Sequence, residues 1–469
     1  MLVRVPGSAR PPASVDGSVR LWATLLPAAA LAMGALAPAT RRGRFAIRGL
    51  AAVTFAWGAL IAVLGARQSS ESRRSLALAD PPVDPAPSTR PTPAAVTILV
   101  PARDEACVIG ALVADLGRLH GQPPGVVVID DGSTDGTGDA ARAAMTVAGM
   151  HGRLIRRSRG GDGKGRALAH VGIGGDPDAI VVVLDADARV GPGFGDACRA
   201  AMAGGVVAAS ARRRMLRPAR PSRATDLLAR LQDDEQEIDD VIQRGRLALG
   251  GAGELRGNGM VLRADVLAEL GGWPLDAVCE DLELSSRLYL NTGHGADRPP
   301  GLTVWEQPVV SLRAIVRQRL RWAEGSIRRD LRIVLPTALR GAKPVRRSVE
   351  PLAYAGQALV PWLAVGMAAR SIGRRGGAAR GGLATLLGSY GIASLTIAWT
   401  ALEATPGQPV RSRVARTLGS AAFAAQWLAF LPIAWLRVAL RSGPPRFEQT
   451  EHAPAADFSG PEPVPPARM

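Results

Sequence analysis

The sequence predicts an α/β domain with a mostly parallel sheet, flanked on both sides by transmembrane helices. In the middle of the chain, strand-like apolar runs alternate with helix-like stretches, as in βαβ units. Long apolar runs precede and follow this region, and each approaches the length that crosses a bilayer. The chain has 469 residues, more than one ordinary domain needs. We therefore expect a soluble module bounded by membrane helices.

The predicted organisation is N-terminal membrane segments at 1–68, a Pro-rich linker at 69–95, a catalytic domain with an interfacial helix at 96–347, C-terminal transmembrane helices at 348–441 and a polar tail at 442–469. Two apolar runs of about 18 residues, Leu21–Pro38 and Gly49–Ala66, lie in the first part. A cleavable signal peptide is disfavoured because the second run follows at once.

Three further apolar runs follow the catalytic domain, at Pro351–Ala369, Gly382–Ala401 and Ser420–Leu440, and Pro432 is expected to interrupt the last. We expect a multi-pass protein of the cell (inner) membrane with a cytoplasmic catalytic domain. Two N-terminal spans would then place several arginines outside, against the positive-inside tendency. These are Arg41, Arg42, Arg44 and Arg48, together with the loop Arg370–Arg380.

Charge and cysteine usage narrow the class of protein. Lys and Arg total 57 against 41 Asp and Glu, a net charge of +16 that suits nucleic acid, an anionic lipid surface or an anionic substrate. The chain has no zinc-finger spacing and no aromatic platform for single strands, so we expect no nucleic acid. Cys107, Cys198 and Cys279 have no metal-ligand spacing, and their odd number argues against a disulfide framework.

The first acidic cluster ends a strand-like run in VVVIDDGSTDGT, at Val126–Thr137. Asp130 and Asp131 at a strand end are able to accept hydrogen bonds from a base and a ribose. The alternative is an Asx-type turn that caps the next helix, a role that suits Ser133 or Asp135.

The second cluster is Asp185 and Asp187 at the end of IVVVLDAD. Alternate strand residues face one side, so both carboxylates are expected to project together. Mg²⁺ or Mn²⁺ prefers such oxygen pairs together with substrate phosphates. The alternative is two solvated acids at a loop start. Lys164, in GDGKGRALA, is placed to approach a phosphate, although a lone lysine is usually just solvated.

The third and fourth clusters lie on expected helices. Glu280 and Asp281 open a helix, where acids are favoured by the helix dipole in any case, but a carboxylate beside apolar walls also serves as a general base. Gln318, Arg321 and Trp322 share one helix face. Arginine binds a diphosphate through two parallel hydrogen bonds, and a tryptophan ring stacks against a sugar. The alternative is a helix that only lies at the membrane interface.

The ordered set IDDGSTDGT, LDAD, CED and QRLRW resembles membrane-bound family 2 glycosyltransferases of the cellulose-synthase-like kind, over about Val96 to Pro336. The later segment RFEQTEH resembles a post-membrane motif of such enzymes, with Phe447 and Gln449 in place of Trp and Lys. The resemblance implies a GT-A fold, which is Rossmann-like, with a UDP-sugar donor, inversion at the anomeric carbon and an Mg²⁺ or Mn²⁺ cofactor.

The resemblance also implies a role for each residue. Asp130 and Asp131 would contact uridine, Asp185 would contact ribose or phosphate beside the metal, and Asp187 would bind the metal. Asp281 would be the base, supported by Glu280. Gln318, Arg321 and Trp322 would position the diphosphate and the acceptor, and Glu105 and Lys164 would lie near the nucleotide. Cys279 stands where the family usually has Thr.

Two acceptors fit this resemblance: a membrane lipid, as in diacylglycerol glucosyltransferases, or a growing glycan, as in processive polysaccharide synthases. The stretch GELRGNGMVLRADVLAELGGW favours the lipid, while QRLRWAEG is similar in both. A catalytically dead membrane scaffold is a further alternative, against which Asp185, Asp187 and Asp281 are all present. A P-loop ATPase is excluded because no GxxxxGK[ST] occurs.

Overall fold

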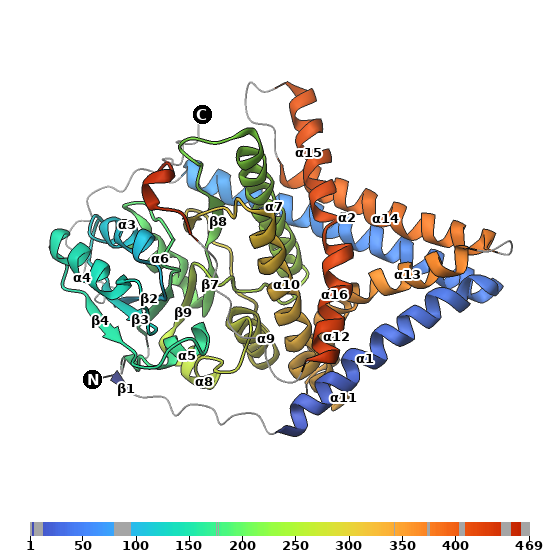
Figure 1. Cartoon of the computed structure of the whole chain (residues 1–469), viewed down its shortest axis with the longest axis horizontal. Coiled ribbons are helices and arrows are strands. Elements are labelled where there is room, and N and C mark those ends of the chain that lie inside the picture. Colours follow the sequence, from blue (N-terminus) through green and yellow to red (C-terminus); the bar gives the residue numbers. More distant parts are fainter. Residues whose placement is uncertain are drawn as a thin grey trace.

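The computed structural model describes residues 2–3, 13–78, 95–174, 176, 178–341, 343–372, 376–402, 409–441 and 452–460. The central sheet lies at one end of the molecule, and several long helices extend away from it (Figure 1). This arrangement agrees with the predicted soluble module bounded by long apolar helices.

The central sheet is mostly parallel, as predicted. Its six strands run in the order β4-β3-β2-β6-β9-β7. Their bounds are β2 (Val96–Ala102), β3 (Gly125–Asp130), β4 (Arg153–Arg156), β6 (Ile180–Val183), β7 (Ala208–Ser210) and β9 (Met260–Arg263). Strands β2, β3, β4 and β6 are parallel, and β9 is antiparallel to both β6 and β7. Two short parallel strands, β8 (Arg212–Met215) and β10 (Thr303–Glu306), form a separate pair.

Helices cover both faces of this sheet. Successive residues of β2 point to opposite sides, and apolar residues on both sides are buried under helices. Ile98 and Val100 pack on one face, and Leu99 packs on the other. The first face carries α3 (Ala106–Leu116), α4 (Thr137–Val147) and α6 (Phe194–Ala201). The second carries α5 (Lys164–Ala169), α8 (Ala264–Glu269) and α9 (Glu280–Thr292). Two apolar cores therefore fix the strand ends that carry the acidic residues.

Two long helices connect the sheet to the apolar helices. They are α7 (Arg223–Ala248) and α10 (Leu312–Arg329), and α10 continues through a π-helical turn, Asp330–Val334, into α11 (Leu335–Leu339). Helix α7 begins with a side-chain cap, in which Ser222 accepts the N–H of Thr225. The short β1 (Leu2–Val3) pairs with β5 (Ile173–Gly174).

Within the described residues, five helical segments are long and apolar enough to cross a membrane: Gly17–Ala39, Arg41–Glu71, Arg347–Ser371, Gly377–Ala401 and Val410–Leu440. They comprise α1 (Ala13–Leu36), α2 (Arg41–Leu78), α12 (Val345–Gly356), α13 (Val360–Ser371), α14 (Gly377–Ala401), α15 (Val410–Ala424) and α16 (Trp427–Leu440). In Figure 1, α2 and α14 run side by side, while α15 and α16 run across them.

Two expected boundaries were wrong. Helix α2 continues to Leu78, so the linker predicted from residue 69 is helical over its first ten positions. Ser69 and Ser70 do not end the helix, because their hydroxyls donate to the carbonyls of Gly65 and Ala66 one turn earlier. The rest of that linker, 79–94, lies outside the described residues. The last apolar run breaks between α15 and α16, and Pro432 lies inside α16.

Candidate active site

The first acidic pair lies where β2 and β3 end side by side. Ala102 and Asp130 are register partners, and the N–H of Asp131 donates to the carbonyl of Ala102 at 2.8 Å. Both carboxylates are buried and have protein partners. Asp130 accepts the N–H of Ser133 at 2.9 Å, and Asp131 pairs with Arg157. The expected turn role is therefore present at Asp130, and it leaves Asp130 at the edge where parallel strands present ligand sites.

Asp135 confirms the structural alternative for this segment. Its carboxylate accepts the N–H groups of Ala106 at the start of α3 and of Thr137 at the start of α4, both at 2.9 Å. Free N–H groups at helix starts need such acceptors. Asp135 thus ties the two helices together and brings Glu105 up to the end of β3.

The second pair departs from its predicted geometry. Strand β6 ends at Val183, so Asp185 and Asp187 lie in the turn that follows and do not project together from a strand. The side chain of Asp187 is buried, whereas that of Asp185 is 38% exposed. The Asp187 carboxylate accepts the N–H of Gln307 at 3.1 Å. Lys164 binds Asp185 instead. Both carboxylates still belong to one site.

Lys164 joins the second acidic pair to the third. Its Nζ lies 2.5 Å from Asp185 Oδ1 and 3.5 Å from Glu280 Oε1, and it donates to the carbonyl of Gly257 at 2.6 Å. Burial by itself would lower the pKa of Lys164, but Asp185 and Glu280 raise it well above its usual value. Lys164 is therefore a fixed cation between the two carboxylates and is not the solvated lysine of the alternative interpretation.

Glu280 and Asp281 open α9, as predicted, and differ in environment. Glu280 is buried, and burial raises the pKa of its carboxyl against the opposing effect of Lys164. Asp281 is half-buried, and its Oδ1 accepts the N–H of Leu282 at 2.9 Å, so it remains able to receive a proton on Oδ2. Cys279 is packed against α10, where a Cβ at Gly325 would lie 2.4 Å from its Sγ. This close contact fixes the position of the acid pair.

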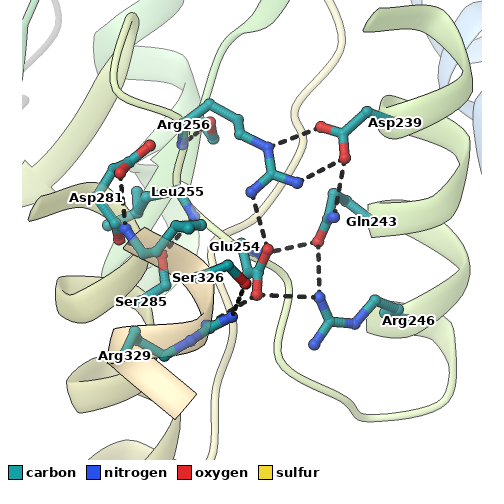
Figure 2. A network of polar contacts seen from close by, with 12 residues as sticks. Asp239, Gln243, Arg246, Glu254, Leu255, Arg256, Asp281, Ser285, Ser326 and Arg329 are labelled. Carbon is teal, nitrogen blue, oxygen red and sulfur yellow. Dashed lines mark hydrogen bonds and ion pairs between the residues drawn. The ribbon is translucent and has the colours of Figure 1, made fainter. Parts of the chain in front are cut away.

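A buried polar network holds the loop before Asp281, with Glu254 at its centre (Figure 2). Glu254 accepts from Arg256 at 2.8 Å and from Arg329 at 3.0 Å, and lies 3.4 Å from Arg246. Arg256 also makes a two-pronged ion pair with Asp239 of α7, at 2.8 and 2.5 Å. A buried carboxylate needs such partners, because a lone buried charge is costly.

A shared hydroxyl connects this loop to α9. Ser285 Oγ accepts the N–H of Leu255 at 2.8 Å and donates to the carbonyl of Asp281 at 2.6 Å (Figure 2). Three residues after Leu255, Asn258 Oδ1 accepts the N–H of Asp185 at 3.2 Å. The loop 254–258 therefore sets the spacing between Asp185 and Asp281. Neither Glu254 nor Arg256 was predicted as a site residue, although both lie in the stretch GELRGNG.

His452, from the RFEQTEH segment, was also missed as a site residue. Its Nδ1 lies 3.7 Å from Asp187 Oδ2, and its Nε2 lies 3.5 Å from Glu105 Oε1. Burial raises the pKa of Asp187 to about 7, with Asp185, Glu306 and Glu105 adding to the rise and His452 opposing it. Burial alone would lower the pKa of His452, but Asp187 and Glu105 raise it to about 9.

The segment around His452 is docked on the catalytic domain. The Gln307 amide makes two hydrogen bonds with the main chain of Ala453, at 3.0 and 3.2 Å. Further along, the N–H of Ser459 donates to the carbonyl of Arg217 at 2.9 Å, and the Phe458 side chain is buried. Gln307 thus touches Asp187 with its backbone and the C-terminal segment with its side chain. The other residues of that motif, 446–451, lie outside the described residues.

The QRLRW segment lies on the helix α10, as predicted, but two arginines that were not predicted lie against its Trp322 ring. The guanidinium carbon of Arg319 lies 4.4 Å from the Trp322 ring centre, and that of Arg213 lies 5.8 Å from it. Arg213 also binds Glu306, whose carboxylate accepts from Asn258 at 3.1 Å. This chain of contacts connects Trp322 to the acidic clusters. Gln318 accepts from Arg319 at 3.2 Å.

Helix α10 is only partly an interfacial helix. Among its apolar residues, Leu312 and Val316 are exposed, but Ile315 and Leu320 are buried in the protein. Its arginines are not all solvated, since Arg319, Arg328 and Arg329 are buried. The catalytic domain therefore wraps around this helix.

The acidic centre fits a divalent cation by the chemistry of its groups. Asp187, Asp185, Glu105 and Glu306 concentrate carboxylates in a buried region, and their mutual repulsion contributes to the raised pKa of Asp187. Carboxylate oxygens suit both Mg²⁺ and Mn²⁺. Over the described ranges, no three His, Cys, Asp or Glu side chains are arranged to enclose a metal by themselves. Substrate phosphates would complete such a site.

Comparison with known proteins agrees with this geometry. Residues 93–325 match the family described as "Glycosyltransferase like family 2". The beta-monoglucosyldiacylglycerol synthase of Synechocystis sp. is 30% identical over 396 residues, covering 79% of this chain and 77% of that protein. The enzyme of the same name from Nostoc sp. is 34% identical over 245 residues, half of each chain. The chain therefore belongs to glycosyltransferase family 2 and has the GT-A fold.

Among solved structures, the mannosyltransferase PcManGT from Pyrobaculum calidifontis, in complex with GDP-Man and Mn²⁺, is 22% identical and has a TM-score of 0.48. The likeness covers 83% of this chain and 99% of that one. Membership of a glycosyltransferase family, with relatives that are named as synthases, argues against the catalytically dead scaffold that the sequence left open.

Proposed function

We propose that this enzyme transfers a sugar, with inversion, from a UDP-sugar to the free hydroxyl of a diacylglycerol-type membrane lipid. The main support for a lipid acceptor is the similarity to a beta-monoglucosyldiacylglycerol synthase over 79% of the chain. The structure agrees with a lipid acceptor, because α10 joins the acidic centre to the apolar helices. We further propose a cytoplasmic catalytic domain in the cell membrane, since nucleotide sugars are cytoplasmic.

In this proposal Asp281 is the general base. The acceptor hydroxyl loses its proton to Asp281 Oδ2 as its oxygen bonds to the anomeric carbon, and the bond from that carbon to the diphosphate breaks. The hydrogen bonds of Ser285 with the carbonyl of Asp281 and the N–H of Leu255 hold Asp281 in place. Trp322, stacked with Arg319, offers a flat surface for the sugar or the acceptor.

The donor is proposed to lie across the strand ends. Asp130 and Asp131 would bind the uridine, and Asp185 the ribose or a phosphate oxygen. Asp187, with His452 beside it, would hold Mg²⁺ or Mn²⁺, which would neutralise the diphosphate and so assist its departure. Glu105 would orient His452. Gln318 and Arg321 are proposed to contact the diphosphate from α10.

The test uses purified full-length enzyme, labelled UDP-glucose, Mg²⁺ or Mn²⁺, and lipid vesicles with or without diacylglycerol. Label in the chloroform phase that requires both diacylglycerol and metal is the expected result. Label in ethanol-insoluble material would overturn the lipid acceptor in favour of a processive polysaccharide synthase. Transfer to diacylglycerol from a different nucleotide sugar alone would overturn the donor and keep the acceptor. The Asp281→Asn variant is the inactive control.

A further inference from the structure

The helix pairs α1–α2 and α13–α14, which are far apart in the sequence, lie together at the end of the molecule opposite the sheet (Figure 1). Helices α1 and α13 pack closely there, since a Cβ at Gly366 of α13 would lie 2.1 Å from the carbonyl oxygen of Leu31 of α1. Ile47 and Met367 share one small apolar cluster. We call residues 37–50, 370–372 and 376–382 together the distal tip.

The distal tip is cationic and contains no acid. It holds six arginines and no Asp, Glu or Lys: Arg41, Arg42, Arg44, Arg48, Arg370 and Arg380. Arg44 and Arg380 donate to the main-chain carbonyls of Pro38 and Ser371. Arg41, Arg42, Arg48 and Arg370 are exposed, and no acceptor for their guanidinium groups lies in the part of the chain that the structure describes. Among the described residues, therefore, the protein supplies no counter-charge to these four arginines.

Exposed apolar side chains lie beside these arginines. Leu36 is 69% exposed, Phe45 is 79% exposed and Ile372 is 84% exposed. A surface that combines guanidinium groups with exposed apolar residues suits the boundary between lipid headgroups and acyl chains. Helix α14 has 25 residues, which is about 37 Å of helix and enough to reach from one headgroup layer to the other.

We propose that the distal tip is a binding site for anionic phospholipid headgroups in the leaflet opposite the catalytic domain. Guanidinium groups bind phosphate through two parallel hydrogen bonds, and several of them here converge from two hairpins. Bound phosphate would supply the missing counter-charge. It would also stabilise an orientation that places these arginines on the side disfavoured by the positive-inside tendency. This proposal requires that the apolar helices span the membrane, and it does not depend on which sugar or acceptor the enzyme uses.

The test uses full-length protein in phosphatidylcholine nanodiscs that contain phosphatidylglycerol, and compares the wild type with two triple variants. The relative association of spin-labelled phosphatidylglycerol and phosphatidylcholine is measured for wild type, for Arg41→Gln/Arg42→Gln/Arg370→Gln and for the same triple with Lys. We expect the Gln triple to lose preference for phosphatidylglycerol by about fivefold per arginine at low salt. We expect the Lys triple to retain most of it, which separates lost charge from lost folding.

A matched control removes equal charge from the catalytic domain, as Arg118→Gln/Arg142→Gln/Arg153→Gln, all at exposed positions. It should keep the wild-type preference. An unchanged preference in the tip triple, or an equal loss in the control, would overturn the proposal. In asymmetric vesicles the tip-dependent preference should require phosphatidylglycerol in the leaflet opposite the catalytic domain. Its appearance with phosphatidylglycerol only in the other leaflet would contradict the assigned leaflet.

Discussion

The imidazole of His452 lies 3.7 Å from the carboxylate of Asp187, although membrane helices α12 to α16 separate the two residues in the sequence. The acidic centre is therefore assembled from residues that precede and follow the apolar helices α12 to α16 in the sequence. Glu105 orients the same imidazole from its other nitrogen, at 3.5 Å. The C-terminal segment is fixed by main-chain hydrogen bonds and by the Gln307 amide, so His452 is positioned by the fold.

His452→Ala should weaken metal binding in the presence of UDP by about tenfold or more, because the imidazole neighbours Asp187, the carboxylate that we propose as the metal ligand. Isothermal titration of Mn²⁺ into enzyme with saturating UDP measures this. Cys107→Ser is the control, since Cys107 donates to the main-chain carbonyl of His452 and not to its imidazole. Equal Mn²⁺ affinity in His452→Ala and wild type would remove His452 from the metal site.

Asp187→Ala should reduce metal-dependent donor binding more severely than His452→Ala does. Asp187 is the buried carboxylate of the centre, and its loss removes an ionic ligand. Labelled UDP binding is measured with and without Mg²⁺ or Mn²⁺. Asp196→Ala, at an exposed position on α6, should leave binding unchanged. A metal requirement in Asp187→Ala equal to that of wild type would refute the assigned role.

Asp281→Asn should abolish transfer and leave UDP binding within about a factor of two. The amide keeps the shape of the side chain but does not accept a proton, and loss of a general base costs about 10²–10⁴ in rate. Turnover and UDP affinity are measured on one preparation. Glu269→Gln, an exposed acid on α8, should retain full turnover. Substantial turnover in Asp281→Asn would transfer the base role to another group.

The ion pair between Asp239 and Arg256 makes the stability of the protein depend on pH. Burial would raise the pKa of Asp239, but Arg256 lowers it to about 2 from its usual 3.8. Because the folded-state pKa is depressed, the stabilisation is full above about pH 4 and is lost as the pH falls toward 2. The shift corresponds to about 2 kcal/mol of unfolding free energy.

Asp239→Asn should therefore lower the thermal unfolding midpoint by roughly 4–8 °C near neutral pH, with a smaller difference at pH 3. Circular dichroism of detergent-solubilised protein at pH 7 and pH 3 measures the midpoints. Asp226→Asn on the same helix breaks only an exposed pair with Arg230 and should change the midpoint little. A difference that grows as the pH falls would contradict the sign assigned to this ion pair.

Much of the site was predictable because its residues lie in short contiguous motifs. Asp130 and Asp131 end a strand, Glu280 and Asp281 begin a helix, and Gln318, Arg321 and Trp322 lie on one helix, as expected. The prediction failed where the strand ended early, because β6 stops at Val183 before the second acidic pair. Alternation along a strand therefore did not apply to Asp185 and Asp187.

The sequence by itself determined the α/β class, the order of the acidic clusters and the number of long apolar runs, because periodicity and local turn chemistry are encoded in neighbouring residues. Only the tertiary structure decided which distant groups neutralise one another. It placed His452 against Asp187, Lys164 between Asp185 and Glu280, and Arg256 against Asp239. Such pairings depend on burial and on the cost of an unpaired charge, which are properties of the packed chain and not of any local segment.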